Sequence, residues 1–163
     1  MNNIISVIYE KGIKSSITKK YLKNIAEMTI SSLDINNDIE MGIVITDDAR
    51  IKELNRSYRN INNSTDVLSF HMNPDTNQEL PLDFIFPPDR LKHIGEVIIS
   101  YETAIRQAKE NDLTIKDELA FLLVHGILHL MNYDHIKDND RKKMEKKEKD
   151  IFARIQSNRV ELT

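Results

Sequence analysis

The sequence predicts an α+β fold, in which a small mixed β-sheet carries helices mainly on one side and a single domain spans residues 1–163. Strand-like and helix-like segments alternate along most of the chain. Two strand-like segments, 66–70 and 95–100, are separated by a proline-rich stretch instead of a helix, so we expect a mixed sheet. The 163 residues fit one compact domain, because chains usually divide only beyond roughly 250 residues.

The first half of the chain shows clear hydrophobic periodicity. The predicted elements are a strand over 4–9, a helix within 17–33, a strand over 39–45 and a helix ending near Tyr58. Strict alternation in the second strand predicts one buried face. Asp47 or Asp48 can cap the second helix, since a carboxylate accepts hydrogen bonds from the free amides of a first turn.

The second half begins with a polar loop and continues through strands into helices. The predicted elements are a loop over 59–65, a short strand over 66–70, an irregular arm over 73–89, a strand over 95–100, a helix capped by Ser100, a helix from Asp117 or its neighbour through Met131, and a charged helix over 138–155. The arm contains all four prolines, which favours irregular structure there.

Composition restricts the chemistry. The chain has no cysteine, so any metal must be bound by His, Asp or Glu. A net charge of −3 and a pI near 6.0 argue against a general nucleic-acid binder but allow an RNA partner at a local basic patch. No apolar run approaches the ~20 residues that span a bilayer, and no basic secretory region is visible. We therefore expect a cytoplasmic protein without a membrane partner.

Three of the five histidines, His125, His129 and His135, form the pattern H-x3-H-x5-H. Residues four apart lie on one helical face, with Cβ atoms about 5–6 Å apart, so the first two imidazoles can share one ion. His135 can join them only if the chain turns back after the helix. Asn132 stands where that turn is needed, and asparagine tolerates the left-handed conformation that ends helices.

The surroundings of these histidines favour a metal. Residues 119–131 are apolar on nearly every other face, so the helix is predicted to be buried, and unpartnered imidazoles there would cost about 1–3 kcal/mol each. Core histidines bonded to carbonyls, or a purely structural metal, are the alternatives, but structural sites usually have a fourth protein ligand. Three imidazoles and a water form an open, catalytic arrangement. Zinc is the best candidate, and Ni, Co or Cu are compatible by ligand type.

Gly126 bears on both packing and chemistry. A glycine inside a helix costs about 1 kcal/mol relative to alanine, which indicates close approach of a neighbouring backbone. Zinc proteases of the H-E-x-x-H type carry a glutamate base at this position, and Glu118 lies about two turns too early to replace it. The ligand pattern is similar to that of metzincin proteases, with Asn132 at their turn glycine, but the proteolytic base is missing. A zinc peptidase or other hydrolase is therefore the least favoured alternative, and a glutamate close to the metal in space would revive it.

The segment HGILHLMNYDH at 125–135 resembles the signature of the YbeY family of endoribonucleases, which are rRNA maturation factors. Three more blocks resemble family motifs: LNRSYR at 54–59, STDVLSF at 64–70 and GEVIIS at 95–100. The matching region runs from about residue 41 to 135, with its blocks in the right order. Three positions depart from the family pattern, and none of them removes a metal ligand: Asn132 for Gly, Glu96 for Asp, and His71 for a common Pro.

The resemblance implies a zincin-like fold and one Zn²⁺ per chain, bound by His125, His129 and His135. It implies cleavage of single-stranded RNA, with roles in rRNA maturation, including 3′-end processing of 16S rRNA, and in ribosome quality control. The family's basic catalytic residue falls on Arg59, whose guanidinium suits the nonbridging oxygens of a phosphate. Expected partners are rRNA and ribosomal or small-subunit proteins, without DNA, and no organic cofactor is expected.

Several alternatives stay open at the level of sequence. A ribosome-associated assembly protein with a structural metal and little or no catalysis is the second hypothesis. Arg59 by itself also fits a solvated cation at a helix end. Thr65 and Asp66 fit a loop cap or a substrate cleft, and Asp134 fits either support of an imidazole or a turn. Surface or arm-packing roles are expected for the two remaining histidines, His71 and His93.

Overall fold

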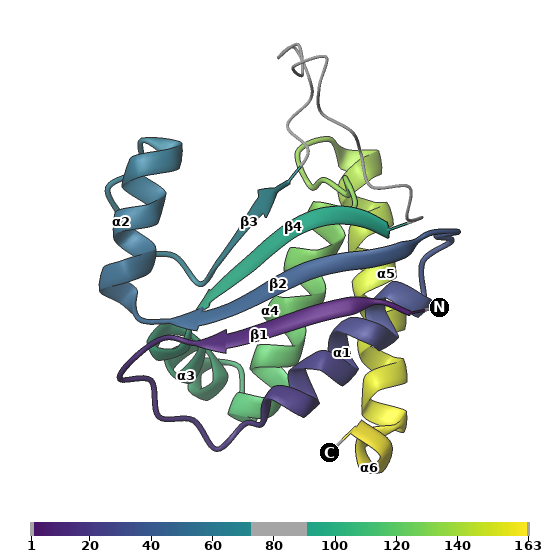
Figure 1. Cartoon of the computed structure of the whole chain (residues 1–163), viewed down its shortest axis with the longest axis horizontal. Helices are drawn as coiled ribbons and strands as arrows, with labels where there is room; N and C mark the ends of the chain where they lie inside the picture. The colour runs from purple at the N-terminus through teal and green to yellow at the C-terminus, as the bar shows by residue number, and fades with distance from the viewer. Residues whose placement is uncertain (1, 73–90, 163) are drawn as a thin grey trace.

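The computed structural model describes residues 2–72 and 91–162, so the predicted arm over 73–89 lies outside the described residues. The described part of the chain forms four strands and six helices (Figure 1). In chain order they are β1 (Ile4–Tyr9), α1 (Lys19–Ser31), β2 (Asp38–Thr46), α2 (Asp48–Arg59), β3 (Val67–His71), β4 (Leu91–Ser100), α3 (Tyr101–Glu110), α4 (Ile115–Leu130), α5 (Asp138–Ser157) and α6 (Arg159–Leu162).

The strands form one mixed sheet in the order β1-β2-β4-β3 (Figure 1). β1, β2 and β4 run parallel, whereas β3 pairs antiparallel with β4 at the edge of the sheet. Two neighbouring parallel strands need a crossover connection, which is usually a helix. The sequence predicts no helix between β3 and β4, and these two strands are antiparallel. The α+β fold with a small mixed sheet is therefore confirmed.

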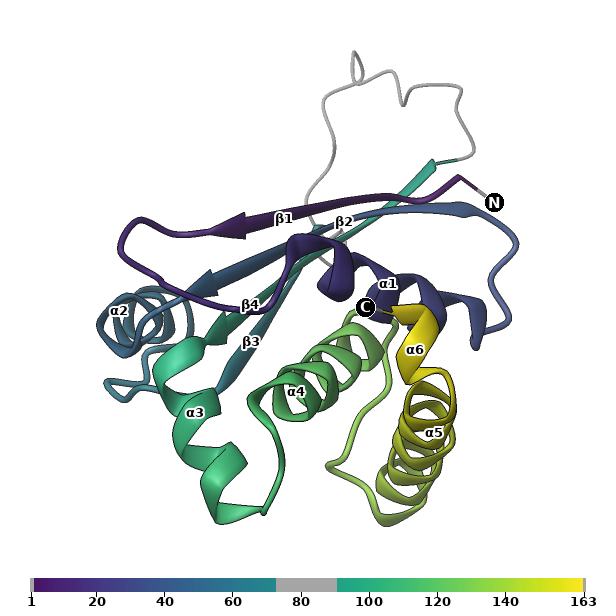
Figure 2. The same ribbon diagram turned by 90° about the horizontal axis from the view of Figure 1, so that it is seen from below.

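Helices α1, α3, α4 and α5 lie on one face of the sheet, with α4 in the middle of this layer (Figure 2). The main hydrophobic core lies between the two layers, where Val97 of β4 and Leu123 of α4 are fully buried. α2 packs on the other face, through a small cluster of Ile51, Leu68 and Ile98. The helices are thus mainly on one side, as predicted, with α2 as the exception.

Two predicted boundaries are wrong for identifiable reasons. α4 begins at Ile115 because Thr114, and not Asp117, caps it: the Thr114 hydroxyl accepts a hydrogen bond from the Asp117 N–H at 3.1 Å. β4 begins at Leu91 instead of Gly95, because a shift in strand register next to Gly95 (φ 127°) interrupts the alternation. The short helix α6 was not predicted.

Other predicted caps are confirmed. Asp47 accepts from the Arg50 N–H at 2.8 Å and begins α2, and the Ser100 hydroxyl accepts from the Thr103 N–H at 3.3 Å and begins α3.

Within the described residues, no helix combines the length and the apolar character that a membrane span requires.

Candidate metal centre

α4 positions two of the three predicted ligands. Most of its residues are buried between the sheet and the neighbouring helices, whereas His125 and His129 are half-buried. Because they are four residues apart, both imidazoles project from the same side of the helix. Their ring centroids are 4.6 Å apart and their Nε2 atoms are 3.1 Å apart.

The end of α4 returns the chain to these histidines. Asn132 has a φ of 68°, the left-handed conformation predicted for it. The Asn132 N–H donates to the His129 carbonyl at 3.0 Å and the Tyr133 N–H donates to the Leu128 carbonyl at 2.9 Å, which is the Schellman pattern. The Asp134 carboxylate then accepts from the backbone N–H groups of His135 and Ile136, at 2.6 and 3.1 Å. Asp134 therefore shapes the turn.

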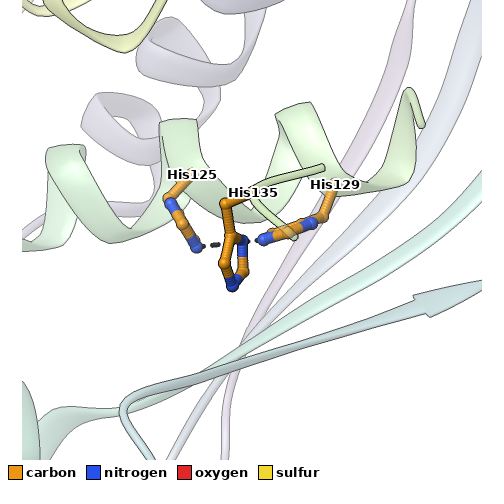
Figure 3. Close-up of side chains that lie close together, drawn as sticks. All are labelled: His125, His129 and His135. Carbon is orange, nitrogen blue, oxygen red and sulfur yellow. Dashed lines mark hydrogen bonds between the residues drawn. The ribbon is translucent and has the colours of Figure 1, made fainter. Parts of the chain in front are cut away.

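The three imidazoles converge as the sequence predicts (Figure 3). One nitrogen from each of His125, His129 and His135 lies within 4.8 Å of the other two. Ligands about 2.1 Å from a tetrahedral zinc stand roughly 3.4 Å apart, so the spacing of the Nε2 pair fits such an ion. In the described part of the chain no other His, Asp or Glu joins the group. The described residues therefore offer three imidazole nitrogens, and no carboxylate, as possible ligands for a metal ion.

The site favours the neutral imidazole that metal binding requires. Burial lowers the pKa of His129, and the neighbouring rings of His125 and His135 lower it further. A hydrogen bond with the Tyr133 backbone and the charge of Asp134 act in the opposite direction, but the net direction is downward. His129 is thus biased toward its unprotonated form near neutral pH.

Gly126 lets α4 lie directly on the sheet. A Cβ at this position would come within 2.6 Å of Val97 Cγ1 and 3.3 Å of Ser69 Oγ, which belong to β4 and β3. The Ser69 hydroxyl also donates to the Gly126 carbonyl at 2.9 Å. The sheet therefore approaches α4 closely at Gly126, as predicted. The prediction that a neighbouring backbone makes this approach is wrong, because the nearest atoms belong to the side chains of Val97 and Ser69.

Arg59 lies at the C-terminal end of α2, with its side chain exposed. Its Nη2 donates to the Ser69 carbonyl at 3.2 Å. Since the Ser69 hydroxyl contacts the carbonyl of Gly126, one strand residue connects the guanidinium to the helix segment next to His125. This contact with the backbone of β3 gives Arg59 a defined position, which a freely solvated cation would lack.

Glu148 is a site residue that the sequence interpretation missed. Its Oε1 lies 2.6 Å from Nδ1 of His125, and its side chain is only 13% exposed. A signal was present, because Glu148 stands four residues after Met144 and three before Ile151, both buried, on an otherwise charged helix. An acid in that register points inward and needs a partner.

The remaining singled-out residues have local roles. The Asp66 carboxylate accepts from the Val67 N–H at 2.7 Å, which fits the loop-cap interpretation of Thr65–Asp66. His71 is exposed at the end of β3, and His93 pairs with Glu40. Neither histidine belongs to the group formed by the three converging imidazoles.

Comparison with known proteins gives one consistent family. The family described as Endoribonuclease YbeY matches residues 5–156 of this chain. A protein named Endoribonuclease YbeY from Dehalococcoides mccartyi is 47% identical over 134 residues, covering 80% of this chain and 83% of that protein. Another of that name from Caldicellulosiruptor bescii is 38% identical over 142 residues, covering 85% of this chain and 89% of its own length.

A solved structure supports the fold. The solution structure of TM1509 from Thermotoga maritima aligns with a TM-score of 0.53 and 22% sequence identity. The alignment covers 95% of this chain and 93% of that one, so the similarity concerns the whole domain.

Proposed function

Since the chain belongs to the Endoribonuclease YbeY family, we propose that it cleaves single-stranded RNA at one zinc ion bound by His125, His129 and His135. Membership makes the chain a hydrolase that acts on RNA. The zinc, the strand preference and the residue roles are our proposal. The observation that carries it is the convergence of three imidazole nitrogens within 4.8 Å, with no fourth ligand among the described residues.

The chemistry divides between the ion and the protein. When bound, zinc polarises a phosphoryl oxygen and lowers the pKa of a bound water toward ~7. His125, His129 and His135 would hold the ion, and the described residues supply no further His, Asp or Glu to this group. Arg59 donates hydrogen bonds to the nonbridging oxygens of the scissile phosphate and neutralises charge that develops there.

The proposed cellular substrate is rRNA, including the 3′ end of 16S rRNA, and the proposed setting is rRNA maturation and ribosome quality control in the cytoplasm. Ribosomal or small-subunit proteins are the proposed partners. This part of the proposal rests on the family alone. An excess of uncut 16S precursor in cells that lack the protein, restored by the native gene and not by a His129→Ala gene, is the result we expect.

The central experiment removes single ligands. His125→Ala and His129→Ala should each lose stoichiometric zinc and lower the cleavage of a single-stranded RNA oligonucleotide by at least about 100-fold, because the open site needs all three imidazoles. His71→Ala is the matched control, since this exposed histidine lies outside the group and should change neither quantity.

Two outcomes would contradict the proposal. Cleavage that survives in a preparation shown to be metal-free would exclude the metal mechanism. Zinc binding without turnover of any single-stranded RNA would favour the assembly protein with a structural metal.

A further inference from the structure

Glu148 occupies an inward-facing position on α5, whereas Asp138, Glu145 and Asp150 of the same helix are exposed. Met144, Ile151 and Ile155 of α5 are buried, and Glu148 falls in the same register. Its side chain is 13% exposed, compared with 64% for Glu145 one turn earlier. A carboxylate withdrawn from water in this way needs a specific partner.

That partner is the outer nitrogen of a proposed ligand. Glu148 Oε1 lies 2.6 Å from Nδ1 of His125, while Nε2 of the same ring lies 3.1 Å from Nε2 of His129. A carboxylate only accepts hydrogen bonds, so Nδ1 must carry the proton. The lone pair is then on Nε2, which faces the other two histidines (Figure 3).

Phe121 and Phe152 flank this contact. The Phe121 ring is stacked on the His125 ring with centroids 6.5 Å apart, and Phe152 meets Phe121 edge to face at 6.1 Å. Phe152 lies on α5, one turn after Glu148. The same helix therefore supplies both the acceptor for Nδ1 and part of the apolar wall beside the ring.

The three histidines are supported in different ways. His129 is followed directly by the Schellman turn that ends α4, and His135 is carried by the turn that Asp134 stabilises. Within the ranges that the structure describes, Glu148 is the only carboxylate that pairs with any of the three. His125 is thus the ligand whose tautomer depends on a side chain.

We propose that Glu148 is a positioning residue of the metal centre: it fixes His125 as the Nδ1–H tautomer and aims Nε2 at the ion. This inference rests on the proposed function for the identity of the ion, but not for the tautomer itself. Partners of this kind typically change metal affinity 10–100-fold when they are removed.

The first test uses the metal-free protein and needs no activity. In ¹⁵N-labelled wild-type chain near neutral pH, the His125 ring should show the single Nδ1–H tautomer by two-bond ¹H–¹⁵N spectroscopy. Glu148→Gln keeps a carbonyl acceptor of the same length and should largely retain that tautomer. Glu148→Ala should give a mixture. A wild-type His125 that carries its proton on Nε2 would overturn the proposal.

The second test measures zinc binding by competition with a chromophoric chelator. Glu148→Ala should bind zinc about 10–100-fold more weakly, and Glu148→Gln should recover most of the loss. Glu145→Gln is the control, because this exposed acid lies on the same helix and pairs with Arg141, so the zinc affinity of this variant should stay within two-fold of wild type. Circular dichroism establishes that each variant is folded before binding is measured.

The outcomes separate this inference from the proposed function. If wild-type protein binds no zinc yet shows the Nδ1–H tautomer, the metal proposal fails and the positioning contact stands. If Glu148→Ala keeps both wild-type tautomer and zinc affinity but loses RNA cleavage, Glu148 acts on substrate and the positioning role is wrong. Should Glu148→Ala not fold, the tautomer of wild-type His125 decides, because a proton on Nδ1 supports the proposal and a proton on Nε2 overturns it.

Discussion

Arg59 is the last residue of α2, and its guanidinium hydrogen-bonds to the carbonyl of Ser69 on β3. It contacts none of the three histidines, so its proposed role concerns the phosphate and not the ion. This separation makes the role testable, because metal affinity and catalysis should respond differently to substitution.

We expect Arg59→Ala to lower kcat for single-stranded RNA cleavage by about 10²–10³-fold, because it removes a preorganised donor to developing negative charge. Zinc affinity should be unchanged. Arg59→Lys should recover only part of the rate, since an ammonium cannot make the two parallel hydrogen bonds of a guanidinium. Arg56→Ala, an exposed arginine one turn earlier, is the control. Equal rate loss in both variants would indicate general charge attraction instead of a specific contact.

Gly126 acts at the same scale through packing. In Gly126→Ala the new methyl would meet Val97 Cγ1 at 2.6 Å, and Val97 is a stiff, fully buried side chain. Overpacking costs about 1–3 kcal/mol, and the higher helix propensity of alanine offsets about 1 kcal/mol of that. We expect a net loss of up to about 2 kcal/mol in urea unfolding, with weaker zinc binding because α4 shifts from the sheet.

The double variant Gly126→Ala/Val97→Ala supplies the control. The loss of unfolding free energy in the double variant should be smaller than the sum of the losses in the two single variants, since the methyl groups removed from Val97 make room for the one added at Gly126. Strict additivity would mean that the contact between α4 and β4 does not limit the packing.

Asp48 connects several elements on the opposite side of the molecule from the C-terminal helix. Its carboxylate accepts hydrogen bonds from Ser100 at 2.5 Å, Thr103 at 2.6 Å and Ser64 at 3.1 Å, and it pairs with Arg106 at 2.8 Å. These partners belong to β4, α3 and the loop before β3. α2, which ends at Arg59, is therefore fixed to the sheet and to α3 through one side chain.

Acid should release this connection. Burial alone would raise the pKa of Asp48, but the hydrogen bonds from Ser100, Thr103, Arg106 and Ser64 outweigh it and lower the pKa to about 2. A pKa depressed on folding contributes stability above the unfolded value of about 3.8, and that contribution is lost as the pH falls toward 2. With the side chain 26% exposed, we expect about 1–2 kcal/mol at pH 7.

Urea unfolding of Asp48→Asn and wild type at pH 7, 5 and 3 checks this prediction. The difference between them should be constant from pH 7 to 5 and should fall by roughly half at pH 3. Glu53→Gln, on the same helix with an exposed partner in Arg50, should show little difference at any pH. A difference that stays the same down to pH 3 would show that ionisation of Asp48 is not the cause.

The hydrophobic core and the three-histidine group are separate parts of the molecule. The main core unites the helical layer with β1, β2 and β4 and contains no histidine. The imidazoles lie at its margin, half-buried or exposed. We therefore expect the chain to fold without the ion, unlike small zinc domains, in which the metal-binding energy is the folding energy.

We expect chelation to abolish RNA cleavage while the chain stays folded by near-ultraviolet circular dichroism. Zinc at about 100 times its dissociation constant adds about 2.7 kcal/mol, which corresponds to a rise in Tm of roughly 5–10 °C for a domain of this size. Calorimetry with and without zinc measures the shift. Loss of tertiary structure on chelation would instead identify the metal as structural.

The sequence by itself determined the fold class, the order of nearly all elements, and the convergence of His125, His129 and His135, because these depend on local periodicity and short spacing. A run of apolar residues predicted β1 and strict alternation predicted β2. Asp47 and Ser100 marked helix starts, and Asn132 marked the left-handed turn. The H-x3-H-x5-H spacing placed two rings on one helical face and needed only one turn to add the third.

Tertiary structure alone decided the contacts that join distant segments. Glu148 meets His125 across 23 positions, Ser69 meets Gly126 across 57, and Asp48 meets Thr103 across 55. No local pattern encodes such pairs, because they depend on how whole helices pack against the sheet. Arg59 is a second example. The sequence predicts a cation at the end of a helix, but the hydrogen bond from Arg59 to the backbone of β3 forms only when α2 packs next to the edge of the sheet.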